Sequence, residues 1–141
     1  MEKIKIMIWR DIIINCRPEN VEIVSALAKI FDIREDKIDV IDAIENSQSN
    51  QSVICVLFEL FGHFCLMLSF YLDFKVDNEI LLIAQICDEL NCEALITNDN
   101  TENPYSMFLV DGEGKSCEVS IDPDKLDEYE EYKITNYTST H

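Results

Sequence analysis

The stretch 53-VICVLFELFGHFCLMLSFYL-72 decides the fold, because its 20 residues are nearly all apolar and could cross a bilayer as one helix. Glu59 and His63 lie near its middle, and Lys75 is the only basic residue close to either end, a pattern unfavourable for a membrane helix. Gly62 and His63 suit a two-residue type II′ turn. We therefore predict a β-hairpin with strands at 53–61 and 64–72. Because both faces are apolar, these strands should be central ones, covered by helices, a loop or a partner.

The residues before the hairpin predict a strand, a helix and a second strand. Residues 3–14 alternate and are rich in isoleucine, with an irregularity expected near Arg10 and Asp11. Pro18 and Glu19 mark a helix start, after which apolar residues recur at helical spacing up to position 31. A short strand is expected within 37–44, followed by a polar loop at 46–52.

The residues after the hairpin predict a second helix and three strands. Asp77 or Asn78 can cap the helix, and Asn91 can end it in a left-handed conformation. Strands are expected at 93–97, 105–110 and 116–121, with a tight turn at 111–114.

These elements together predict an α+β protein: one globular domain over 1–141, with a largely antiparallel β-sheet and two main helices. Residues 133–141 are a candidate disordered tail. The order helix, strand, loop and hairpin occurs at 19–72 and again at 78–121. Internal duplication and chance recurrence are both compatible with this order, since residue identity between the two units is poor.

The net charge of −17 is large for a domain of 141 residues, and it is uneven. Residues 1–75 hold 12 acids and 8 bases, a net of −4, whereas residues 76–141 hold 16 acids and 3 bases, a net of −13. Such a field repels nucleic acids and anionic membranes and accelerates association with a basic partner. Simple solubility is the alternative explanation.

The sequence has no catalytic signature. It contains two histidines, no glycine-rich phosphate loop and no C-x-x-C pair for zinc. The loops starting at Asp99 and Asp111 do not match the calcium-binding pattern of EF-hands. Six cysteines without a signal peptide favour reduced thiols in the cytoplasm. We therefore expect no enzyme activity, no cofactor and no metal, and Glu59 should be an acid paired with a Lys or Arg or placed at an exposed edge.

The segment 122-DPDKLDEYEEY-132 is the strongest candidate for a binding surface. As a helix it would rest Leu126, Tyr129 and Tyr132 on the domain and present carboxylates to solvent. A solvated helix face is the alternative, because acids early in a helix suit its dipole. The candidate contact residues are Asp122, Asp124, Asp127, Glu128, Tyr129, Glu131 and Tyr132, together with Asp99, Glu102, Asp111 and Glu113.

The run 103-NPYSMFLVDGEGKSCEVSIDPDKLDEYEEY-132, in a small acidic chain without catalytic groups, resembles bacterial immunity proteins of polymorphic-toxin and contact-dependent growth inhibition systems. The resemblance is one of type and implies no particular fold. It implies a cytoplasmic protein that binds and neutralises a cognate toxin domain, often a basic nuclease.

Three functions follow as hypotheses. The first is a non-enzymatic inhibitor of a basic protein, with no nucleic acid or membrane as partner. The second is a structural or adaptor module that homodimerises through the apolar hairpin. The third is a small hydrolase that uses carboxylates.

Overall fold

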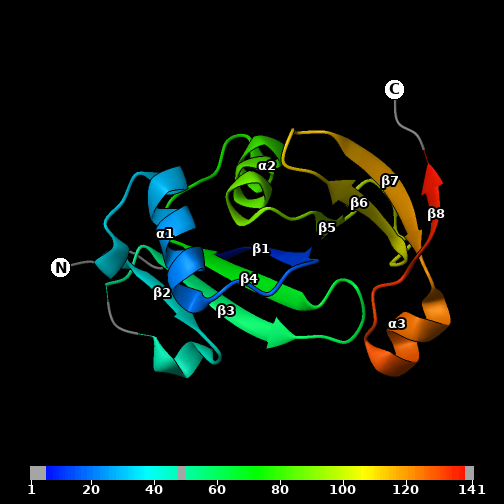
Figure 1. Ribbon diagram of the computed structural model, residues 1–141, viewed down its shortest axis with the longest axis horizontal. Helices are drawn as coiled ribbons and strands as arrows, with labels where there is room; N and C mark the ends of the chain where they lie inside the picture. Colours follow the sequence, from blue (N-terminus) through cyan, green and yellow to red (C-terminus); the bar gives the residue numbers. More distant parts are fainter. Residues whose placement is uncertain (1–5, 48–49, 139–141) are drawn as a thin grey trace.

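The computed structural model describes residues 6–47 and 50–138 (Figure 1). The elements in chain order are β1 (Met7–Ile14), α1 (Asn20–Phe31), the 3-10 turn η1 (Glu35–Lys37), β2 (Ile38–Ile41), the 3-10 turn η2 (Ile44–Asn46), β3 (Val53–Glu59), β4 (Leu66–Leu72), α2 (Glu79–Leu90), β5 (Ala94–Thr97), β6 (Ser106–Val110), β7 (Ser116–Ile121), α3 (Pro123–Tyr129) and β8 (Ile134–Thr138).

Within the described residues, all of the strands belong to one eight-stranded sheet in the order β2-β3-β4-β1-β5-β6-β7-β8. Every neighbouring pair is antiparallel except β2 and β3, which are parallel. The first strand of the chain therefore lies in the interior of the sheet, between β4 and β5. This architecture confirms the predicted α+β class and the largely antiparallel sheet.

The decisive apolar stretch forms the predicted hairpin. Val53 faces Leu72 and Glu59 faces Leu66, so the register is centred on Gly62 and His63. Gly62 has a φ of +96°, a conformation that favours glycine. The turn is longer than the predicted two-residue type II′ turn, because β3 ends two residues earlier and β4 begins two residues later than predicted. Beyond the strands, the Leu60 N–H donates to the Cys65 carbonyl oxygen and the Cys65 N–H donates to the Ile14 carbonyl oxygen, both at 3.0 Å. Within 6–47 and 50–138, no helix is long and apolar enough to cross a membrane.

The capping signals in the sequence also act as predicted. Glu19 is the N-cap of α1, and its backbone N–H donates to the Glu22 carboxylate at 3.0 Å. The Asn78 side chain accepts a hydrogen bond from the Leu81 backbone N–H at 3.2 Å and so caps α2. Asn91 ends α2 with a φ of 54°. The irregularity expected near Arg10 is a register shift between Ile8 and Arg10.

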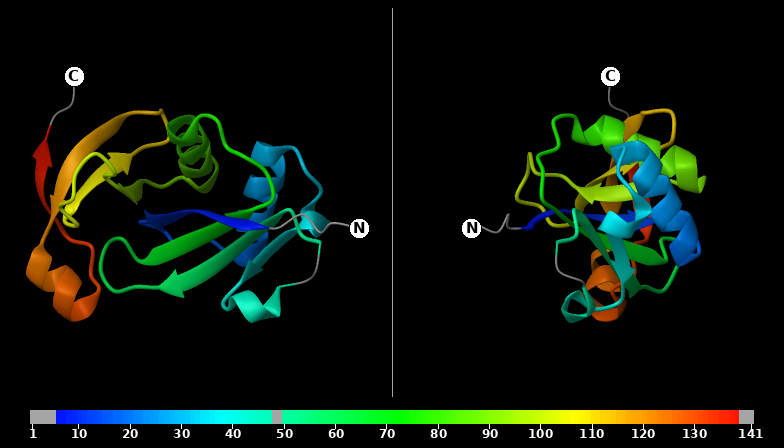
Figure 2. Two further views of the ribbon diagram at one scale, coloured as in Figure 1. Left: turned by 180° about the vertical axis from the view of Figure 1, so that it is seen from behind. Right: turned by 90° about the vertical axis from the view of Figure 1, so that its left-hand side faces the viewer.

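The main core lies between one face of the sheet and the helices α1 and α2, which Figures 1 and 2 show on the same side. Ile12 and Phe70 from the sheet pack there against Leu27 of α1 and Ile83 of α2, and all four side chains are fully buried. An ion pair of 2.8 Å between Lys29 and Glu89 joins the two helices at the surface. This face explains why the hairpin needs apolar residues at alternate positions.

A second core covers the opposite face of the sheet in its C-terminal half. It contains Leu95, Met107 and Val119 from three neighbouring strands, and Leu126 of α3 packs against it. Apolar residues on both faces of β5 and β6 therefore have partners within the chain, which places α3 firmly on the domain.

Three features differ from the sequence predictions. Residues 134–138 are not a disordered tail, because they form β8 and pair with β7, while 139–141 lie outside the described residues. In addition to the two main helices, the segment considered as a helix at 122–132 forms a third, shorter helix, α3, which the predicted fold class did not count. The two predicted repeat units share their element order but not their pairing, because β2–β3 is parallel and β5–β6 is antiparallel. This difference counts against a duplication.

Candidate functional site

The acidic segment forms α3, and its ends are set by side-chain chemistry. The Asp122 carboxylate accepts hydrogen bonds from the backbone N–H groups of Asp124 and Lys125, at 3.0 and 3.2 Å. Pro123 fits the first turn, where no hydrogen-bond donor is needed. Glu130 ends the helix in the left-handed conformation, with a φ of 54°. Asp122 is therefore a structural cap as well as a predicted contact residue.

The predicted apolar stripe is correct at two of its three positions. Leu126 and Tyr132 pack against the second core, whereas the Tyr129 side chain is exposed and lies beneath the Lys125 ammonium group, 5.3 Å from the ring centre. Because α3 ends at Tyr129, Tyr132 reaches the core through the turn at Glu130 and not through helical spacing. Burial raises the pKa of Tyr132, and the carboxylates of Asp11 and Glu130 add to the increase.

The outward side of α3 is strongly acidic. Residues 122–133 contain six acids and two lysines, a net of −4. Asp124, Glu128 and Glu130 are exposed. Asp127 is also exposed, but it accepts a 2.7 Å hydrogen bond from the Tyr105 hydroxyl, which raises the pKa of the phenol. Glu131 is half-buried and lies against Gly62 at the hairpin tip.

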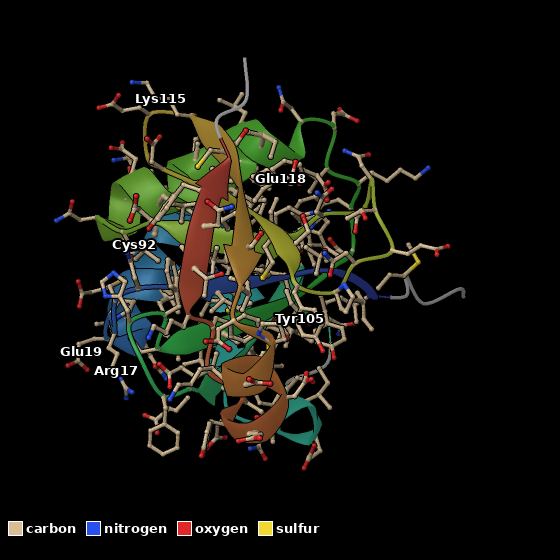
Figure 3. All side chains as sticks on the ribbon, turned by 90° about the vertical axis from the view of Figure 1, so that its right-hand side faces the viewer. Arg17, Glu19, Cys92, Tyr105, Lys115 and Glu118 are labelled. Atoms are coloured by element: carbon tan, nitrogen blue, oxygen red, sulfur yellow. The ribbon has the colours of Figure 1, made fainter. Side chains whose placement is uncertain are left out.

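The β5–β6 loop adds further acids at the same end of the sheet. Tyr105, at the end of this loop, is bonded to Asp127 of α3, and Figure 3 shows Tyr105 beside that helix. Glu102 is exposed on the loop. Asp99 is exposed but pairs with the Arg10 guanidinium at 2.7 Å, so part of its charge is neutralised within the chain.

The two remaining predicted residues, Asp111 and Glu113, lie elsewhere. They occupy the β6–β7 turn, at the opposite end of that hairpin from α3, as the position of Lys115 in Figure 3 shows. The Asp111 carboxylate accepts hydrogen bonds from the backbone N–H groups of Glu113 and Lys115 and so shapes the turn. The turn lies on α2, because a Cβ on Gly112 would come within 3.1 Å of the Asp88 Cα. The predicted contact residues therefore form two separate surfaces.

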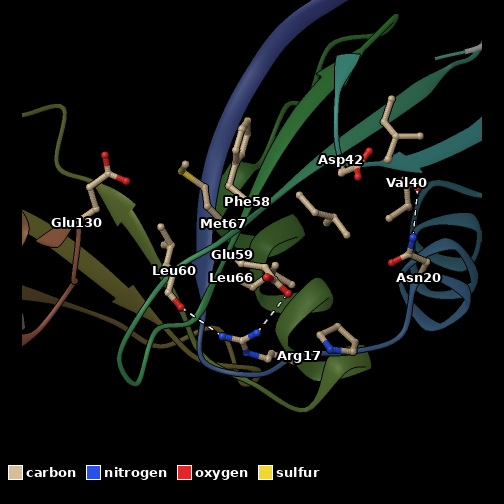
Figure 4. Close-up of a pocket in the computed structure, with 13 residues that line it drawn as sticks. Arg17, Asn20, Val40, Asp42, Phe58, Glu59, Leu60, Leu66, Met67 and Glu130 are labelled. Carbon is tan, nitrogen blue, oxygen red and sulfur yellow. Dashed lines mark hydrogen bonds and ion pairs between the residues drawn. The ribbon is translucent and has the colours of Figure 1, made fainter. Parts of the chain in front are cut away.

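The structure also contains a groove that the sequence did not predict, shown in Figure 4. It has a volume of about 890 Å³ and lies between the end of β2, the end of β3 and the C-terminal end of α3. Its apolar lining includes Leu57, Phe58 and Met67, and its carboxylates are Asp42, Glu59 and Glu130. Nearby at the hairpin tip, the Phe61 side chain is 79% exposed.

Arg17 closes the groove at its hairpin end. The guanidinium donates to the Glu59 carboxylate and to the Leu60 carbonyl oxygen, both at 3.3 Å, as drawn in Figure 4. Glu59 is 81% exposed, so this acid is paired at an exposed edge, as the sequence suggested. Phe58 is 44% exposed and so contributes accessible apolar surface to the groove.

The pKa values of three cysteine thiols are unfavourable for a nucleophilic site. Burial raises the pKa of Cys16 to about 12, with neighbouring Cys92 adding to the effect, and burial also raises the pKa values of Cys55 and Cys117. Such thiols hold little thiolate at neutral pH. The His63 ring lies 3.4 Å from the Asn15 amide. All six cysteines are free, and the described residues contain no cluster of His, Cys, Asp and Glu arranged to hold a metal ion.

Comparisons with protein-family models, with curated proteins and with solved structures found no match to this chain.

Proposed function

We propose that this protein is a non-enzymatic inhibitor that binds a basic protein partner, and that it acts as a bacterial immunity protein against a cognate toxin domain. The observation that carries the proposal is the acidic end formed by α3 and the β5–β6 loop. There, Asp124, Glu128 and Glu130 are exposed on an element anchored to the core through Leu126. A rigid, charged element of this kind suits electrostatic steering.

A nuclease toxin is the partner class that fits this charge best. Such an enzyme presents positive charge to phosphate, and an acidic protein can occupy that surface. The free state of all six cysteines agrees with action in a reducing compartment such as the cytoplasm.

The structure narrows the residues to be tested. Asp122 caps α3, Asp127 holds Tyr105, Asp99 pairs with Arg10 and Asp111 shapes a turn, so substituting them would perturb the fold as well as the surface. Asp124 and Glu128 are exposed, and no side-chain hydrogen bond or ion pair is described for either of them. They are the better probes of binding.

The test takes the protein encoded by the neighbouring reading frame, which the proposal expects to contain a basic toxin domain, and measures its association with this chain at a series of salt concentrations. The double variant D124K/E128K should reduce the association rate about tenfold or more at low salt, and the difference should shrink as salt screens the charges. The matched control is E113K, which changes an exposed acid on the opposite surface. Equal rates for wild type and D124K/E128K, or a rate independent of salt, would refute the role of α3.

A further inference from the structure

Strand β3 is longer than its neighbour β2, and this difference leaves part of its edge open. Strand β2 pairs with Val53–Val56 only, because it ends at Ile41 opposite Val56. The last three residues of β3, Leu57–Glu59, pair with β4 on one side. Their other side borders the groove, and within the described part of the chain no strand pairs with it.

The backbone groups of Glu59 point toward this open side. The Leu60 N–H donates to the Cys65 carbonyl oxygen, and the Asp73 N–H donates to the Ser52 carbonyl oxygen, both within the β3–β4 register. In an antiparallel pair, hydrogen-bonded positions alternate along each strand. Even-numbered residues of β3 therefore face β4, and the N–H and C=O groups of Leu57 and Glu59 face away from it.

The side chains around the open edge determine what could pair with it. Leu57, Phe58 and Met67 offer apolar surface on both faces of the sheet. Asp42, Glu59 and Glu130 surround that surface with carboxylates, and the single cation of the lining, Arg17, already pairs with Glu59. An apolar surface with a surplus of negative charge fits a segment that alternates apolar and basic residues.

We propose that the groove receives an extended basic segment of the protein partner, which adds to the sheet as a short strand along Leu57–Glu59. The proposal rests on the proposed function only in taking the partner to be a basic protein. Main-chain hydrogen bonds to the Glu59 edge hold the segment, the apolar side chains of the segment cover Phe58, and its basic side chains meet Asp42 and Glu130. A second copy of this chain fits less well, because edge-to-edge pairing would bring two acidic rims together.

The first experiment uses three synthetic peptides with alternating valine and lysine: one unmodified, one N-methylated at the valines and one N-methylated at the lysines. In a strand added to an edge, alternate N–H groups face the sheet, so methylation of one set should weaken binding about tenfold or more and methylation of the other set should change it little. Equal affinities for the two methylated peptides would overturn the proposal, because charge attraction alone does not distinguish them.

The second experiment locates the peptide by amide hydrogen exchange. Binding should slow the exchange of the Glu59 amide about tenfold or more, since that N–H gains an acceptor. The outer edge of β8 is the control, because it is the open edge at the other end of the described sheet. Protection along Ile134–Tyr137 with no change at Glu59 would overturn the assignment. The Glu59 amide could also become protected without peptide as the protein concentration rises. That result would identify a second copy of this chain as the occupant and would overturn the proposal.

Two variants separate charge from backbone pairing. E59A removes the carboxylate but keeps the N–H, whereas E59P also removes the N–H at a position where an edge strand tolerates proline. E59P should bind the unmodified peptide at least about fivefold more weakly than E59A, with both variants checked for folding by unfolding curves. Should E59P misfold, the methylated peptides and the exchange data still decide. The effect of D124K/E128K on the association rate is measured separately, so the proposal for the groove and the proposed function can be refuted independently.

Discussion

At the scale of single residues, Tyr105 connects the β5–β6 loop to α3 through its hydrogen bond to Asp127. The carboxylate accepts the phenolic proton, and this bond raises the pKa of Tyr105 above its ordinary value. The neutral phenol is therefore the form that the folded state favours. The stabilisation is complete below pH about 10 and is lost as the pH rises through the raised pKa of Tyr105.

The first prediction follows from this bond. D127N should lower the pKa of Tyr105 toward the ordinary value of about 10, because the charged acceptor is removed. Titration of protein labelled with ¹³C at the tyrosine ring carbon that bears the hydroxyl measures it. Tyr132 is the internal control, since burial is the main cause of its raised pKa and D127N leaves that burial intact. An unchanged Tyr105 pKa in D127N would contradict the assignment.

Arg10 is the second residue whose partners decide its role. Burial acts to lower its pKa, but hydrogen bonds to Glu79 and Asp99 outweigh this effect and raise it. Glu79 also accepts a hydrogen bond from the Trp9 indole N–H at 2.9 Å. Glu79 therefore joins the start of α2 to β1, whereas the Asp99 side chain is 70% exposed.

The second prediction compares these two acids. E79A should lower the free energy of unfolding by about 1.5–3 kcal/mol, because it removes one of the two carboxylates that pair with the half-buried Arg10 guanidinium and takes the acceptor from the Trp9 indole N–H. D99A should lower it by less than about 1 kcal/mol, as for an exposed ion pair. Urea unfolding followed by the fluorescence of Trp9 measures both. A larger loss in D99A than in E79A would show that Asp99 is primarily structural.

At the scale of elements, the tip of the β3–β4 hairpin lies against the end of α3. Gly62 has a positive φ, and a Cβ placed there would come within 2.8 Å of the Glu131 Cγ. Glycine is therefore favoured at position 62 for two reasons: the positive φ of the turn and the closeness of the Glu131 side chain. This contact positions the hairpin tip and α3 beside the groove.

The third prediction separates the two requirements at Gly62. G62A should lower the free energy of unfolding by about 1–2 kcal/mol from the backbone alone, with an additional loss from the clash. In the E131A background only the backbone part should remain. Unfolding curves of the four proteins in this double-mutant cycle measure the coupling. If G62A has the same effect in both backgrounds, Glu131 does not constrain the tip.

Local chemistry made most of the elements predictable. The Gly62-His63 pair centres the hairpin, Asn78 caps α2 and Asn91 ends it, because each signal acts within a few residues of its own position. Strand pairing depends on distant residues instead. Nothing near Ile38 indicates that β2 would run parallel to β3, and 134-ITNYT-138 becomes a strand because β7 offers it an edge.

The candidate site was predictable in its charge and not in its shape. The acids of 122–131 are visible in the sequence as a run. The bonds of Asp127 to Tyr105 and of Asp99 to Arg10 join residues far apart in the sequence, so the sequence does not show that these two acids already have partners within the chain. Nothing in the sequence indicated that Phe58 would be exposed, since it lies within an apolar run. Its exposure depends on the packing around the end of β3, which only the folded structure shows.

At the scale of the whole molecule, the apolar hairpin is largely covered within the chain. Strands β3 and β4 lie inside the sheet, and one of their faces packs against α1 and α2. The apolar side chains of the hairpin that remain exposed are Phe58 and Phe61. The hairpin therefore needs no second copy to cover it.

The fourth prediction concerns oligomeric state and charge. Sedimentation equilibrium at micromolar concentration should give the mass of one chain, because the net charge of −17 opposes self-association. The same self-repulsion should make the protein more stable when salt is added, by screening charges beyond about 10 Å at 0.1 M. A dimer mass would favour the adaptor hypothesis over the inhibitor. A Tm that falls with added sodium chloride would contradict the charge argument.

The interior position of β1 has a consequence for protein synthesis. This strand is synthesised before both of its neighbours in the sheet, which are completed only at Leu72 and Thr97. Because protein synthesis adds about 5–20 residues per second, several seconds pass between the synthesis of Ile12–Ile14 and the pairing of both edges of their strand. Until Thr97 is made, the nascent chain therefore carries an apolar strand with at least one unpaired edge, the kind of exposed surface that chaperones protect. The two halves of the sheet join through a strand that was made before its partners on either side.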